Sequence, residues 1–111
     1  MTNKPKRSIA NRLNKAQVAT SNTLADTEIL NQATEYEFAE TKMQAGLALF
    51  QTAQNAVHVR KLAQGNQQQA TQDQHAALDT LDDWLARFIK IARVALADKP
   101  QLLEKLGITV K

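Results

Sequence analysis

The chain has 111 residues, a length that fits one domain with a modest core. It has no cysteine, which excludes disulfides, thiolate catalysis and zinc–thiolate sites. The net charge is only +3, no apolar run approaches the roughly 20 residues that span a bilayer, and no apolar segment follows the basic start as in a secretory signal. We therefore expect a cytoplasmic protein with no membrane span.

The N-terminal third predicts a basic tail over residues 1–7 and a first helix over about 8–33. Ser8 is a suitable N-cap, because its hydroxyl can accept a hydrogen bond from a free backbone amide. The apolar stripe of this helix recurs at steps of three and four residues through Ile9, Leu13, Ala16, Thr20, Leu24, Thr27 and Leu30. The segment 20–23 has low helix propensity and is a candidate kink or break. We expect a continuous helix, because the stripe stays in phase across it.

A second helix is predicted over about 36–63. Thr34 and Glu37 have the spacing of a capping box, which places the helix start beside them. Met43 and Phe50 lie on its apolar stripe. Arg60 and Lys61 suit its C-terminus, and the following segment 65–66, Gly-Asn, favours a left-handed stop.

A third helix is predicted over about 67–97, and its apolar face broadens toward the C-terminal end. Pro100 ends it, because proline disfavours helical backbone at the preceding residue. The last segment, 100–111, contains a short helical turn with four large apolar residues, namely Leu102, Leu103, Leu106 and Ile108. We expect this segment to act as a lid on the third helix, with a second chain as the alternative cover.

These elements predict a single all-α domain over residues 1–111. Long helices of similar length joined by short turns indicate an antiparallel up-down three-helix bundle with a short C-terminal helical turn. The expected core anchors are the large apolar residues of the second and third stripes: Met43, Phe50, Leu81, Trp84, Phe88 and Ile91.

The titratable residues do not form a recognisable catalytic or metal-binding motif. His58 and His75 have no acid three residues before them, unlike the Glu-x-x-His pairs of metal sites in helical bundles. Asp79, Asp82 and Asp83 are expected to face water, and Asp83 to pair with Arg87. The sequence therefore predicts no enzyme activity, no cofactor and no metal.

Basic residues cluster at the N-terminus and on the third helix. They are candidate contacts for an anion: Lys4, Lys6, Arg7, Arg12, Arg87, Lys90 and Arg93. We interpret them as a solubilising tail and as cations that favour the helix dipole. The alternative is a weak nucleic-acid or anionic-surface binding module. The ridge 87–93 also has a possible partner in the acidic stretch 26–40 of another chain.

The stretch 84–96, WLARFIKIARVAL, is followed by Pro100 and by LEKLGI at 103–108. It resembles the C-terminal signature of a group of uncharacterised bacterial helical-bundle proteins, in which a segment like KIARVAL precedes a variable acidic turn and ends in LxxLGI. The match covers about a quarter of the chain and is structural in character. The resemblance implies a bacterial helical bundle and no particular reaction. We expect a non-enzymatic structural or interaction domain that binds an unknown protein partner or itself.

Overall fold

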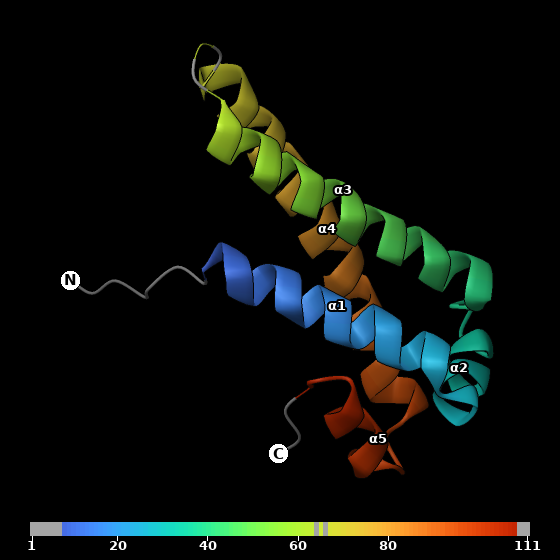
Figure 1. Cartoon of the computed structure of the whole chain (residues 1–111). Helices are drawn as coiled ribbons and strands as arrows, with labels where there is room; N and C mark the ends of the chain where they lie inside the picture. The colour runs from blue at the N-terminus through green and yellow to red at the C-terminus, as the bar shows by residue number, and fades with distance from the viewer. Residues whose placement is uncertain (1–7, 64, 66, 109–111) are drawn as a thin grey trace.

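The computed structural model describes residues 8–63, 65 and 67–108, which are all-helical with no strand. The helices are α1 (Ile9–Ala25), α2 (Thr27–Thr34), α3 (Glu40–Leu62), α4 (Gln67–Ala95) and α5 (Pro100–Lys105) (Figure 1). The all-helical prediction is confirmed. Within the described residues, no helix has both the length and the apolar character to cross a membrane.

Helix α1 begins and continues as its local sequence predicts. The Ser8 hydroxyl accepts a hydrogen bond from the Asn11 amide at 3.1 Å, so the predicted N-cap is confirmed. The helix is continuous through 20–23, because Thr20, which is fully buried, donates its hydroxyl to the Ala16 carbonyl at 2.8 Å. The threonine is thus satisfied within the helix and does not break it.

The expectation of a single helix over 8–33 is wrong, because the helix is interrupted at Asp26. This residue has extended backbone angles (φ −114°, ψ 110°) and separates α1 from α2. Its carboxylate accepts a hydrogen bond from the Ile29 amide at 3.1 Å and so caps α2. Asp26 is a favourable N-cap residue, and the new helix that it starts is α2.

The predicted capping box at Thr34 is also wrong. Thr34 is the last residue of α2, and its hydroxyl donates to the Leu30 carbonyl at 2.7 Å. Glu37 then takes a left-handed conformation (φ 74°), and the Phe38 amide donates to the Ala33 carbonyl at 2.9 Å. This is a Schellman-type helix end. It turns Phe38 into the core and delays the start of α3 to Glu40.

The C-terminal segment packs against the rest of the molecule. Pro100 occupies the first turn of α5, where its missing amide costs nothing. The four large apolar side chains of the C-terminal segment are all buried, with exposed fractions of 1 to 5%: Leu102, Leu103, Leu106 and Ile108. The Asn22 side chain of α1 donates to the Lys105 carbonyl at 2.6 Å. The segment therefore lies against α1, and residues 109–111 of the expected lid are outside the described part.

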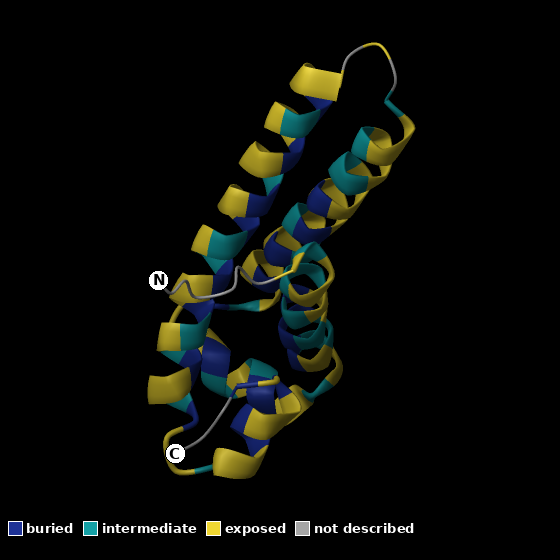
Figure 2. Cartoon of the chain, turned by 90° about the vertical axis from the view of Figure 1, so that its left-hand side faces the viewer, coloured by how far each residue is buried: buried dark blue, intermediate teal, exposed yellow. Residues whose placement is uncertain are grey.

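Helices α3 and α4 form a long antiparallel hairpin, and α1 lies against only part of it (Figure 1). Residues 57–62 and 67–75 of the hairpin, here called the arm, project away from α1. Buried residues face inward along the helices, as Figure 2 shows. Asn66, the second residue of the predicted 65–66 stop, lies outside the described residues.

The core is centred on the end of the hairpin away from the arm. Met43, Leu81 and Phe88 are fully buried, and Phe50 is 5% exposed. Trp84 and Ile91, two other expected anchors, are only partly buried. The Trp84 ring stacks on Phe88 with centroids 5.5 Å apart and meets the Phe38 ring edge-on at 5.9 Å. An aromatic cluster therefore joins α4 to the segment before α3.

Candidate functional site

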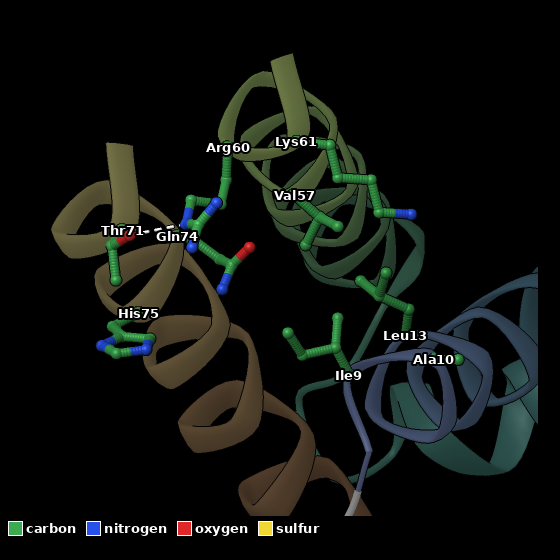
Figure 3. Close-up of a pocket in the computed structure, with 9 residues that line it drawn as sticks. All are labelled: Ile9, Ala10, Leu13, Val57, Arg60, Lys61, Thr71, Gln74 and His75. Carbon is green, nitrogen blue, oxygen red and sulfur yellow. Dashed lines mark hydrogen bonds between the residues drawn. The ribbon is translucent and has the colours of Figure 1, made fainter. Parts of the chain in front are cut away.

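A cleft of about 480 Å³ opens where the start of α1 diverges from the arm (Figure 3). Three helices line it, with the following residues: Ile9, Ala10, Leu13, Val57, Arg60, Lys61, Thr71, Gln74 and His75.

The floor of the cleft is apolar. Ile9 and Leu13 belong to the buried stripe of α1, and Val57 continues the buried stripe of α3. Because the two helices separate here, these side chains are only partly buried, although the same stripes are buried at Ala16 and Ala53. The divergence of the helices thus creates an apolar surface that neighbouring side chains do not cover.

The wall of the cleft on the α3–α4 side is polar. The Arg60 Nε donates to the Thr71 hydroxyl at 2.6 Å, which joins the two helices of the arm. Gln74 is only 7% exposed, and its amide makes no hydrogen bond within the part of the chain that the structure describes. The sequence offered one signal for this burial, since Gln74 lies four residues after Ala70 and four before Leu78, both of them buried.

The candidate anion-binding residues do not form one site. Arg12 donates from its Nε to the Asp82 carboxylate at 3.0 Å, and its Nη2 lies 3.4 Å from Asp79. Asp82 is partly exposed to water, and its ion pair with Arg12 was not predicted from the sequence. Lys4, Lys6 and Arg7 lie outside the described residues. The remaining three, Arg87, Lys90 and Arg93, are exposed on α4.

The expected pair between Asp83 and Arg87 is absent from the described ion pairs, and both side chains are exposed. His58 is exposed on α3, while His75 is exposed at the cleft. Among the described residues, no group of three histidines or acids is placed to hold a metal ion.

Acidic residues of α2 are paired with the C-terminal part of the chain. Asp26 lies 3.2 Å from the Lys105 ammonium, and Glu28 pairs with Lys99. The pKa of Asp26 lies below its usual value, mainly because the Ile29 amide donates a hydrogen bond to the carboxylate and secondly because Lys105 does so. Two acids of the 26–40 stretch are therefore already partnered within the molecule.

Two large apolar side chains of the arm are exposed and were not singled out by the sequence. Val59 is 47% exposed and Leu62 is 65% exposed. They are three residues apart on α3 and share a face of the helix. Val59 is two residues after Val57, which places it about 200° around the helix from the buried stripe and therefore on the exposed side.

Comparison with protein-family models, with curated proteins and with solved structures finds no match to this chain.

Proposed function

We propose that this chain is a non-enzymatic protein-interaction module of the cytoplasm, built on an antiparallel up-down three-helix bundle. Its interaction surface is the arm, on which Val59 and Leu62 are exposed to solvent. Single exposed apolar residues are ordinary on protein surfaces. Here two of them share one face of a projecting helix, and covering them with a partner removes their apolar area from water.

The environments of the titratable residues support a role without catalysis. A general acid or base needs a carboxylate or imidazole that is placed in a shielded site beside the reacting group. Asp79 and Asp82 are paired with Arg12, and both histidines are exposed within the described part of the chain. None of these groups has the environment of a catalytic residue.

Binding to nucleic acid through the basic N-terminus is the less favoured function. Arg12 is the member of the N-terminal basic cluster that the structure describes, and two carboxylates neutralise it. A phosphate would have to displace them before it could pair with this guanidinium.

The proposal is tested by photo-crosslinking of the full chain in cells. A benzophenone amino acid at position 62 should give protein adducts. The same group at Gln51, an exposed position of α3 outside the arm, should give few. An adduct of twice the chain mass would identify self-association. The double variant Val59→Gln/Leu62→Gln should keep its melting temperature and show no association in sedimentation. Equal yields at positions 51 and 62 would exclude the arm as the interaction surface.

A further inference from the structure

The cleft beside α1 holds a guanidinium that is oriented by its neighbour. The hydrogen bond from the Arg60 Nε to Thr71 fixes the guanidinium plane between α3 and α4. It is the one hydrogen bond of the Arg60 side chain among the described residues, so the two terminal nitrogens remain available. Those nitrogens form the edge that contacts a carboxylate through two hydrogen bonds.

Gln74 adds a second polar group to the same wall. Its side chain is more than nine-tenths buried, it points into the space between α4 and α3, and its amide makes no hydrogen bond to any described residue (Figure 3). The amide atoms themselves still reach the solvent of the cleft, so they are accessible to a ligand. A ligand oxygen beside Arg60 would give the Gln74 amide the acceptor that it lacks.

The rest of the cleft suits an apolar body. Ile9, Leu13 and Val57 form its floor, and its volume of about 480 Å³ is within the range of small-ligand pockets. A ligand that fills the cleft would restore to these three side chains the contacts that they lose where α1 leaves the arm.

The charge of the cleft selects the sign of the head group. None of its nine lining residues is acidic, and Arg60 and Lys61 both carry positive charge. The chain that precedes Ile9 contains Lys4, Lys6 and Arg7 and has the same sign, so charge disfavours it as the occupant.

We propose that this cleft is a binding site for a small amphiphilic monocarboxylate, a molecule with one carboxylate head and an apolar chain. The carboxylate pairs with Arg60 and accepts from Gln74, and the chain lies on Ile9, Leu13 and Val57. This site is separate from the proposed interaction surface, because Val59 and Leu62 lie on other faces of α3 from Val57.

Decanoate, kept below its micelle-forming concentration, is a suitable probe for the full chain in solution. Titration followed by NMR should show saturable binding. Shifts should be concentrated at the Arg60 Nε, the Gln74 side-chain amide and the methyl groups of Ile9, Leu13 and Val57. Decanol, which has the same chain without the charge, should bind about tenfold or more weakly. Acetate, which has the head alone, should cause no saturable shift.

Substitution tests the head-group contact. Arg60→Gln should weaken decanoate binding about tenfold or more. The matched variant Arg87→Gln, which removes an exposed arginine of α4, should leave it unchanged. Circular dichroism checks that both variants are folded. If Arg60→Gln is unfolded, the positions of the NMR shifts that decanoate causes in the unmodified chain test the head-group contact instead. Equal binding of decanol and decanoate, shifts spread outside the cleft, or an absence of saturation would overturn the proposal.

Discussion

At the scale of single residues, Gly46 sets how closely α3 approaches α4. A Cβ atom at this position would overlap the indole ring of Trp84, which is packed between Phe38 and Phe88. The indole nitrogen is buried without a hydrogen-bond partner in the described structure. The position of the ring therefore depends on its packing against Phe38 and Phe88, and an added methyl group would disturb that packing.

Gly46→Ala should consequently destabilise the protein. Replacing a helical glycine by alanine ordinarily stabilises a helix by about 1 kcal/mol, but overpacking costs about 1–3 kcal/mol. We expect the free energy of unfolding to fall by up to about 2 kcal/mol in chemical denaturation. Gly65→Ala is the control, because nothing lies within 4 Å of a Cβ added there. A stabilised Gly46→Ala variant would show that the indole ring yields easily.

At the scale of the helices, the end of α2 determines where α3 begins. Glu37 has a φ of 74°, a conformation that suits glycine and strains a residue with a side chain. The strain is tolerated because the turn places Phe38 in the core, where its ring lies 5.5 Å from that of Phe88. Tertiary packing thus overrides the local preference of the glutamate.

Glu37→Gly should stabilise the protein by about 0.5–1 kcal/mol, since relief of the left-handed strain exceeds the added entropy of the unfolded chain. Glu35→Gly, two residues earlier, should destabilise it, because Glu35 has ordinary helical angles (φ −64°, ψ −18°). Thermal and chemical unfolding of both variants measure the difference. If both substitutions change the stability in the same direction, the helix end described here is incorrect.

At the scale of the whole molecule, the C-terminal segment closes the side of the bundle formed by α1. Leu106 and Ile108 are nearly fully buried, and Asn22 and Asp26 contact Lys105. The segment therefore covers apolar surface of the core that would otherwise be exposed to water.

Deletion of residues 100–111 should lower the melting temperature and cause self-association through the uncovered surface. Sedimentation velocity and thermal unfolding measure both effects. Leu106→Ala should destabilise the full chain by about 2–5 kcal/mol, whereas Glu104→Ala, at an exposed position of the same C-terminal segment, should have little effect. An unchanged melting temperature and sedimentation coefficient after deletion would show that the segment is dispensable.

The sequence by itself determined the features that depend on neighbours within about one helical turn. Ser8 starts α1, Pro100 starts α5, and the periodic apolar stripes define the long helices. The break at Asp26 and the late start of α3 were not predictable in this way, because the same local signals also fit a continuous helix and a capping box. What selected them was the burial of Phe38 and the contact of Asp26 with Lys105.

The cleft and its polar wall were decided by the tertiary structure. Arg12 meets Asp82, 70 residues away, and this pair exists only because α1 lies against α4. Arg60 and Gln74 are both compatible with a solvated helix surface when each is considered alone. They form one wall because the arm is antiparallel, and the apolar floor opens because α1 diverges from the arm. Helix periodicity fixes which side of each helix is apolar, but the angle between helices depends on packing among distant residues.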